Sequence, residues 1–293
     1  MYRLLKRNSS GFSLVELLIG LTITMLIVGA FIDLFIRQNK SYSSESLRQE
    51  MNLNGRIGLD EIQREAMNAG TGLPGLFASV QVRNAGATNP DTVTFIYVPQ
   101  TNLNLKFADS PKPNASANSM KLSDDSQIDQ LVVGDDLIIF DETDFNIIEI
   151  TQINLPSKTV NFVPPRGVNT PQGLAKAYEP ATTTITRVSL FSMTVDKTES
   201  AHPKLVKFRG TINLGTVAYD IENLQVQLIF EDSDTASVAN DSDSDLTNDS
   251  MDLQAIKVTL FARSSKTDPL NTTGDHYWRQ QFTSTISPRN IIY

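Results

Sequence analysis

The feature that most constrains the fold is a long apolar segment close to the N-terminus. Between Phe12 and Ile32 the only charged residue is Glu16. As an α-helix these 21 residues would span about 30 Å at ~1.5 Å per residue, which is the thickness of the hydrocarbon core of a bilayer. Three basic residues and no acidic residue lie in residues 1–11, so the positive-inside rule places this leader in the cytoplasm. We therefore predict that residues 12–36 form the transmembrane half of a longer N-terminal helix.

A secretory signal peptide and a plain membrane anchor are the two alternatives for the apolar segment. A signal peptide has a shorter apolar core and a cleavage site of small residues, whereas here the apolar residues continue past Gly29 and Ala30. A plain anchor fits the length, but it gives no reason for Glu16. A charge at the bilayer centre costs about 2.5–3.5 kcal/mol on insertion scales, and such residues usually have a function.

The start of the apolar segment reads Gly-Phe-Ser-Leu-Val-Glu from Gly11 to Glu16. These residues resemble the class III signal of type IV pilins and type II secretion pseudopilins. The resemblance implies that a prepilin peptidase cuts after Gly11, that the new N-terminus at Phe12 is methylated, and that Glu16 is kept for assembly. One physical reason for Glu16 is that a buried carboxylate needs a partner, which the free amine of a neighbouring subunit can supply.

A second helical pattern continues over residues 37–70. Small and apolar residues recur there every three or four positions, as on one face of an amphipathic helix. The members of this stripe are Leu47, Met51, Gly55, Gly58, Ile62, Ala66 and Ala69. Because no proline occurs before Pro74, we predict one continuous helix over residues 13–67, about 80 Å long.

The periodicity changes to that of β-strands over residues 71–293, which we expect to form a periplasmic or extracellular domain. The predicted strands are residues 92–98, 131–140, 146–153, 159–163, 183–195, 205–213, 216–230, 253–263 and 277–286. Two polar insertions, at about residues 101–130 and 231–252, are expected to be mobile surface loops. The expected fold class is α+β: a long N-terminal helix, with a transmembrane half and an amphipathic half, packed on an antiparallel β-sheet domain.

Composition and motifs argue against an enzyme and against a nucleic-acid-binding protein. The formal net charge is −8, whereas binding to nucleic acid requires clustered basic residues. No glycine-rich phosphate loop, G-x-S-x-G or H-E-x-x-H motif occurs. We interpret Gly134, Asp135 and Asp136 as an acidic bend at the start of a strand, and His276 as a structural residue on a strand edge.

One acidic segment has the spacing of a calcium loop. Oxygen-bearing side chains occupy positions 1, 3, 5, 7, 9 and 12 of a twelve-residue window, as in an EF-hand. They are Asp241, Asp243, Asp245, Thr247, Asp249 and Asp252. Leu246 stands where this loop has glycine, and position 12 carries the short Asp252 rather than glutamate. Two alternatives therefore remain: a weak Ca²⁺ site, the one cofactor that we consider, or a solvated acidic loop.

Shorter segments of the domain resemble PilW-type minor pilins. They are the helix end at residues 61–70, the segments 134–139 and 148–151, the later segments 187–191 and 220–226, residues 263–264, and residues 282–290 near the end of the chain. The resemblance implies a minor pilin subunit of a type IV pilus that acts in pilus initiation near the fibre tip. The alternatives are a J-type minor pseudopilin of a type II secretion system and a tip module that binds or adheres to a surface.

The same resemblance implies where the chain is located and with what it assembles. The expected location is the inner membrane of a Gram-negative bacterium, with the C-terminal domain in the periplasm, and later the cell-surface pilus. The expected partners are other minor pilins, the major pilin, the prepilin peptidase, the inner-membrane assembly platform and a large tip adhesin.

Overall fold

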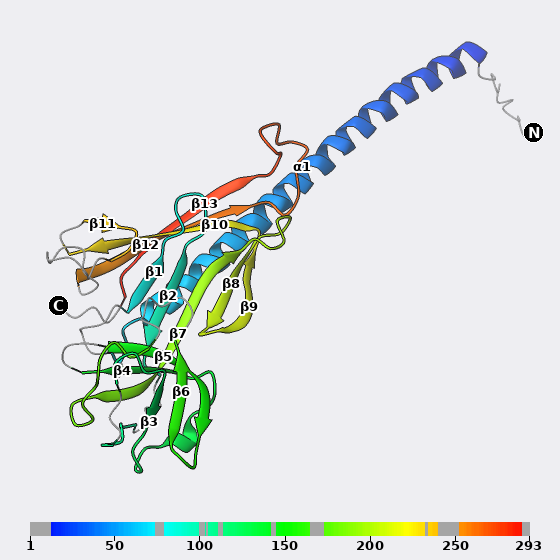
Figure 1. Ribbon diagram of the computed structural model, residues 1–293. Coiled ribbons are helices and arrows are strands. Elements are labelled where there is room, and N and C mark those ends of the chain that lie inside the picture. Colours follow the sequence, from blue (N-terminus) through cyan, green and yellow to red (C-terminus); the bar gives the residue numbers. More distant parts are fainter. Residues whose placement is uncertain are drawn as a thin grey trace, which may run out of the picture.

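A computed structural model describes most of the chain. The described residues are 13–73, 79–99, 103, 105–110, 114–141, 145–164, 173–231, 234–239 and 252–288. They form one long helix, α1 (Leu14–Asn68), one short 3-10 helix (Ile128–Gln130) and thirteen strands. The C-terminal half of α1 packs against a β-rich domain, while its N-terminal half extends away from the domain (Figure 1). This architecture confirms the predicted fold class.

Helix α1 confirms the prediction of one continuous helix to within one residue at each end. Ser13 caps its N-terminus, and the chain leaves the helix at Gly70 and Gly72, both of which have positive φ. The predicted stripe faces the domain: Met51, Gly55, Gly58, Ile62, Ala66 and Ala69 are buried, and Leu47 is half-buried. The amphipathic half therefore docks through the face that its periodicity indicates.

The strands form two antiparallel sheets. The larger sheet has the order β1-β2-β7-β4-β5-β6-β3, and the hairpin of β8 and β9 joins it through β7. Its strands are β1 (Val80–Arg83), β2 (Thr92–Tyr97), β3 (Ser119–Lys121), β4 (Asp136–Phe140), β5 (Phe145–Asn154), β6 (Thr159–Val163), β7 (Thr184–Asp196), β8 (Lys204–Arg209) and β9 (Ile212–Tyr219). The smaller sheet has the order β11-β10-β12-β13, with β10 (Ile221–Phe230), β11 (Thr235–Ala236), β12 (Leu253–Arg263) and β13 (Arg279–Ile286).

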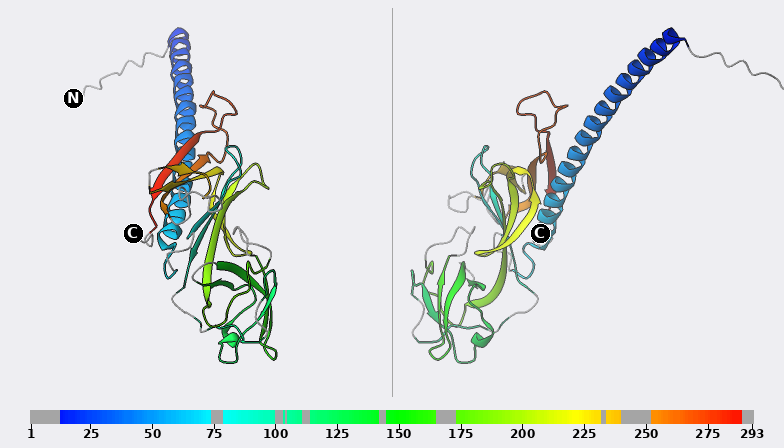
Figure 2. Two further views of the ribbon diagram at one scale, coloured as in Figure 1. Left: turned by 60° about the vertical axis from the view of Figure 1, so that its left-hand side comes forward. Right: turned by 90° about the vertical axis from the view of Figure 1, so that its right-hand side faces the viewer.

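Strand β7 connects two lobes of the domain. One part of β7 pairs with β2 and β8 beside α1, and the other part pairs with β4. Strands β3 to β6 form a distal lobe, at the end of the domain that lies away from the N-terminal half of α1 (Figure 2). The lobe next to the helix and the distal lobe each have their own apolar core.

The prediction of a mobile loop over residues 101–130 is wrong for much of what the structure describes. Leu103, Leu105 and Phe107 are buried in the distal core, together with Met120 of β3 and Ile128 of the 3-10 helix. Apolar residues at alternate positions insert into this core, although the segment as a whole is polar. The segment is therefore a structural part of the distal lobe.

Three predicted strands are wrong in their bounds. Residues 205–213 contain the turn between β8 and β9, where Gly210 has positive φ, and Asp220 interrupts residues 216–230 with a φ of 57°. Residues 131–135 precede β4 in a turn at Gly134, so that β4 begins only at Asp136. In contrast, β12 has the predicted bounds.

Candidate functional site

The candidate site for processing and assembly is the N-terminus of α1. Gly11 and Phe12 lie outside the described residues. Ser13 and Glu16 form a capping box: the Ser13 backbone N–H donates to Glu16 Oε2 at 3.0 Å, and the Val15 N–H donates to Ser13 Oγ at 3.4 Å. Two backbone donors that a helix end leaves unpaired are thereby satisfied. Glu16 therefore turns its carboxylate toward the N-terminal end of the helix.

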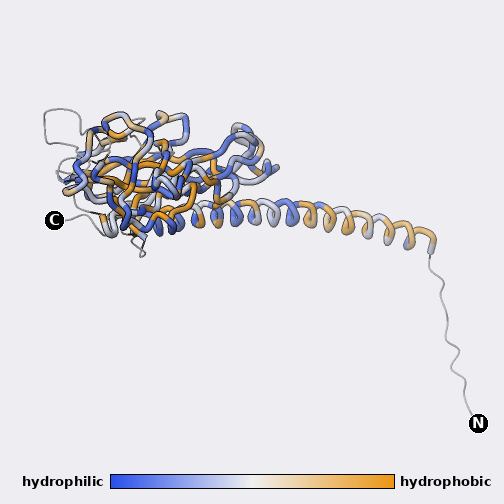
Figure 3. The backbone as a smooth tube through the Cα atoms, turned by 60° about the horizontal axis from the view of Figure 1, so that its bottom comes forward, coloured by the Kyte–Doolittle hydropathy of each residue, from blue (hydrophilic) through white to orange (hydrophobic). Residues whose placement is uncertain are grey.

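The first half of α1 offers an apolar surface that the domain does not cover. Its side chains are exposed from Leu14 to Ile36, and Figure 3 shows this half as mostly hydrophobic. Thr22 and Thr24 donate their hydroxyls to helix carbonyls one turn back, at 2.8 and 2.7 Å, so neither needs a partner in lipid. In the part of the chain that the structure describes, α1 is the one helix long and apolar enough to cross a membrane, with a window of mean hydropathy 2.4.

The helix and the domain approach one another closely at two glycines, Gly55 and Gly58. A Cβ atom on Gly55 would clash with the ring of Phe282 on β13, and one on Gly58 would lie 3.0 Å from Leu260 of β12. The absence of side chains at these positions lets the strands pack directly on the helix backbone. Glycine weakens an isolated helix, but in α1 these two glycines form part of the joint with the domain.

A buried ion-pair cluster fixes the same joint. Lys207 of β8 donates to Glu61 at 2.8 Å and to Glu65 at 2.7 Å, and the side chains of Lys207 and Glu65 are buried or nearly so. Tyr97 of β2 donates to Glu65 at 3.3 Å. Burial and then the neighbouring Glu65 carboxylate raise the pKa of Tyr97 well above its usual value. No pattern in the sequence indicates this cluster, because its members come from three separate elements.

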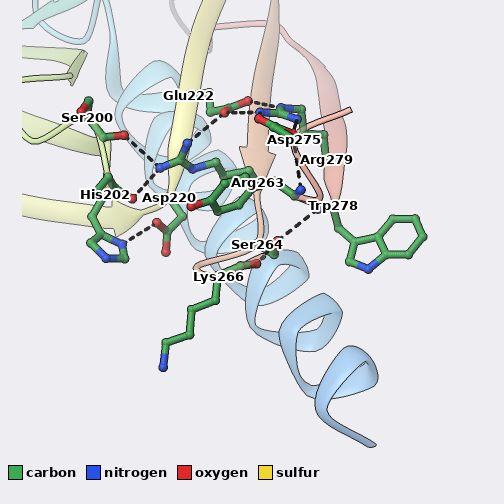
Figure 4. Close-up of polar contacts among 12 residues, drawn as sticks. Ser200, His202, Asp220, Glu222, Arg263, Ser264, Lys266, Asp275, Trp278 and Arg279 are labelled. Atoms are coloured by element: carbon green, nitrogen blue, oxygen red, sulfur yellow. Dashed lines mark hydrogen bonds and ion pairs between the residues drawn. The ribbon is translucent and has the colours of Figure 1, made fainter. Parts of the chain in front are cut away.

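A second polar cluster holds the segment between β12 and β13 (Figure 4). Arg263 donates to the Ser200 carbonyl at 3.0 Å and pairs with Glu222 at 3.3 Å. Arg279 pairs with Glu222 at 2.7 Å and with Asp275 at 2.6 Å. Hydrogen bonds from Arg279 hold the pKa of Asp275 well below its usual range. The charges of Arg263, Arg279, Glu222 and Asp275 are thus paired with one another, as in a structural network.

The same cluster contains the only imidazole–carboxylate pair among the described residues. His202 Nδ1 lies 3.0 Å from Asp220 Oδ1. The nearby Ser264 hydroxyl instead donates to the Lys266 carbonyl at 2.8 Å and accepts the Trp278 N–H at 3.1 Å. Nucleophilic catalysis requires a hydroxyl directed at the base, and this serine is directed elsewhere. The prediction that His276 lies on a strand edge is wrong. His276 lies in the segment before β13, where its ring Nδ1 contacts the Asn271 carbonyl.

An acidic pair lies buried in the distal lobe. Asp136 on β4 stands directly opposite Glu149 on β5. Among the described residues, Asp136 Oδ1 and Glu149 Oε2 have no hydrogen-bond partner, while Thr211 donates to Glu149 Oε1 at 2.6 Å. Burial first, and then the Glu149 charge, raise the pKa of Asp136 to about 8. The preceding Asp135 lies in a turn and pairs with Arg187 at 2.7 Å.

The predicted calcium ligands fall mostly outside the described residues. Asp241, Asp243, Asp245 and Asp249 are not described, and Asp252 directly precedes β12. Within the described residues, no group of three or more histidine, aspartate or glutamate side chains is arranged to hold a metal ion.

Comparisons with known proteins support the interpretation of the N-terminus. Residues 6–32 match the family described as the prokaryotic N-terminal methylation motif, so the chain carries a prepilin motif at the start of its membrane-length helix. Among solved structures, a type IV-like pilin from Thermus thermophilus is similar, with a TM-score of 0.37 and 10% identity over 84% of this chain and 97% of that one. At this TM-score the likeness supports no functional conclusion. No curated protein sequence matches the chain.

Proposed function

We propose that the chain is a PilW-type minor pilin, a structural subunit that acts in the initiation of a type IV pilus and lies near its tip. The observation that carries the proposal is the coincidence of three features at one end of the chain. A methylation motif covers residues 6–32, a helix of membrane length begins at Leu14, and Glu16 caps that helix by accepting the Ser13 N–H.

The proposed sequence of events follows from these features. The leader stays in the cytoplasm of a Gram-negative cell, the helix half 12–36 crosses the inner membrane, and the domain is exported. The peptidase cuts after Gly11 and the new N-terminus at Phe12 is methylated. The exposed apolar half of α1 then leaves the lipid and packs among the helices of other pilins, where Glu16 needs a cationic partner.

Two substitutions test processing and assembly separately. Gly11→Leu places a side chain at the cleavage position, and mass spectrometry should find the 11-residue leader still attached. Gly20→Leu is the matched control, because a Cβ atom there meets no other atom within 4 Å, and it should be trimmed normally. Normal trimming of the Gly11→Leu chain would contradict the proposal.

Glu16→Ala should be inserted and trimmed, since insertion becomes easier without the charge, but it should enter pili poorly. Glu16→Gln tests whether the charge or the hydrogen bond matters, because the amide can still accept the Ser13 N–H. Counting pili and measuring type II secretion in the same strains separates the minor pilin from the J-type pseudopilin. Loss of secretion with normal piliation would replace the pilus assignment.

A further inference from the structure

Strand β9 is an edge strand that lacks charged residues and proline. Among the residues that the structure describes, β9 pairs only with β8, and residues 212–216 are all exposed. The strand reads Ile-Asn-Leu-Gly-Thr-Val-Ala-Tyr, with neither charge nor proline. Natural proteins commonly protect edge strands with charged residues, proline or very short length, because an exposed edge pairs with other chains.

The other described edges of the fold are protected. Strands β3 and β11 have only three and two residues. Strand β1 has four residues and ends in Arg83, and β13 packs against α1 through Phe282 and carries Arg279. Strand β9 itself lies against α1 at Ala218, next to Gly58, so its open part is the uncharged stretch of residues 212–216.

An apolar patch adjoins this edge. Two apolar residues of β9 and two of the turn before β4 have exposed fractions of 43% to 63%. They are Ile212, Leu214, Val132 and Val133. The two segments are neighbours, since a Cβ atom at Gly134 would lie 3.8 Å from Ile212 Cδ1. We define Ile212, Leu214, Val132 and Val133 as the β9 patch.

A β-bulge helps to present the patch. In the ladder, Phe208 pairs with Asn213 and Lys207 pairs with Gly215, which leaves Leu214 as the extra residue. Bulges redirect side chains and bend the strand, and here Leu214 is half-exposed. A second register shift occurs near Val217, so a partner strand must follow a curved edge.

The height of the patch excludes a lipid surface as its partner. Along α1, Glu65 lies 28 residues beyond Arg37, or about 40 Å from the end of the membrane half. Lys207 contacts Glu65, and Ile212 lies farther along the same hairpin. The partner must therefore be a protein that projects from the membrane to a similar height.

The direction of β9 also excludes antiparallel pairing with a second β9. Leu205 of β8 lies against Gly58, and Lys207 reaches Glu61 and Glu65, so β8 runs in the direction of α1. Strand β9 is antiparallel to β8 and runs against α1. A two-fold axis between two β9 strands would direct the two anchors to opposite sides, whereas both must enter one membrane.

We propose that the free edge of β9 and the β9 patch bind an extended, uncharged strand of a different pilin-like subunit anchored in the same membrane. Strand addition supplies backbone hydrogen bonds, and alternate side chains supply specificity. In a second copy the other described edges differ from β9, because β1, β3 and β11 have four residues or fewer and β13 begins with Arg279. The class of the partner rests on the proposed function, while the open edge does not.

The full-length chain has no cysteine, so a single introduced thiol gives a unique crosslinking position. Leu214→Cys is labelled with a photo-crosslinker on cells that also produce the other pilin-like proteins of the same host. Mass spectrometry should identify a strand peptide of another protein with a prepilin motif. Thr285→Cys, an exposed position on β13, is the matched control and should not yield this product.

A competition variant tests the chemistry of the edge. Ile212→Lys places a charge in the patch, and in the Leu214→Cys background it should lower the crosslink yield about tenfold; Thr285→Lys should leave the yield unchanged. Thermal unfolding verifies that both variants remain folded, and Ile212→Ser replaces the lysine variant if its melting temperature falls.

The outcomes separate this inference from the proposed function. A crosslink to a second copy alone would overturn the proposal that β9 binds a different subunit. The absence of any crosslink from a chain that is trimmed and anchored would overturn it too. Both outcomes leave the pilin assignment intact. A chain that is never trimmed overturns the proposed function, and with it the partner class proposed here.

Discussion

Asp136 should destabilise the folded domain near neutral pH, and Asp136→Asn should relieve this effect. The folded-state pKa of about 8, compared with 3.8 in the unfolded chain, means that the folded state binds a proton that the unfolded state releases. The free energy of unfolding therefore falls as the pH rises between these two values, by up to about 1.4 kcal/mol per pH unit. Below the lower value and above the upper value this group contributes no further slope.

The expected size of the effect follows from the same two values. At pH 7 the carboxyl must hold a proton about three units above its unfolded pKa, which costs on the order of 4 kcal/mol. Asparagine removes this cost and can donate an N–H to the unpaired oxygen of Glu149. The second N–H of this asparagine has no evident partner, and burying it unpaired costs about 1–3 kcal/mol. We therefore expect Asp136→Asn to stabilise the domain by about 1–3 kcal/mol at pH 7 and hardly at all at pH 5.

Denaturant unfolding of the full chain in detergent, followed by fluorescence of the single tryptophan, measures this difference at several pH values. Asp109→Asn is the matched control, because that side chain is exposed, and it should not change the pH dependence. A difference between wild type and Asp136→Asn that stays constant from pH 5 to pH 8 would refute the reasoning.

Three further changes test the helix joint and the acidic segment. Lys207→Met should lower the free energy of unfolding by about 3 kcal/mol in denaturant melts, because it leaves the buried Glu65 charge without its main partner. Adding Glu65→Gln to the Lys207→Met chain should restore part of the lost stability. The exposed Lys121→Met is the control and should have little effect. Gly55→Ala should lower the melting temperature, because the new methyl group meets Phe282 and overpacking costs about 1–3 kcal/mol, whereas Gly20→Ala should not. If Asp241, Asp243, Asp245, Asp249 and Asp252 bind Ca²⁺, calcium at 100 times its Kd should stabilise the domain by about 2.7 kcal/mol relative to chelator, and Asp243→Ala/Asp245→Ala should abolish the shift; equal melts with and without calcium would show a merely solvated loop.

The elements that could be predicted from the sequence are those that local interactions determine. The bounds of α1 follow from a capping serine, an unbroken periodicity and the glycines at Gly70 and Gly72. The buried stripe on the second half of α1 is predicted correctly, because burial of one helix face repeats apolar residues every three or four positions, whereas a strand alternates them. The same local signals identify most strands, including β12 with its correct bounds.

The errors have tertiary causes. The turn at Gly210 is packed against Asp136 of another strand, and nothing in the neighbouring residues distinguishes it from a strand interior. The composition of segment 101–130 predicts a loop because polar residues dominate it, although its few apolar side chains are buried in the distal core. Lys207 and Glu65 are 142 residues apart, so their pairing could not be inferred from spacing.

The joint between α1 and the domain determines how the chain can present β9 to another subunit. Gly55 and Gly58 bring the strands onto the helix backbone, and Lys207 joins the hairpin of β8 and β9 to two glutamates one turn apart. Close packing and buried ion pairs both resist rotation of the domain about the helix. The membrane sets the direction of α1, and the joint transmits that direction to β9. A partner anchored beside this chain therefore meets the edge of β9 at a fixed height and in a fixed orientation, so that shape can select the partner at a surface that carries no charge.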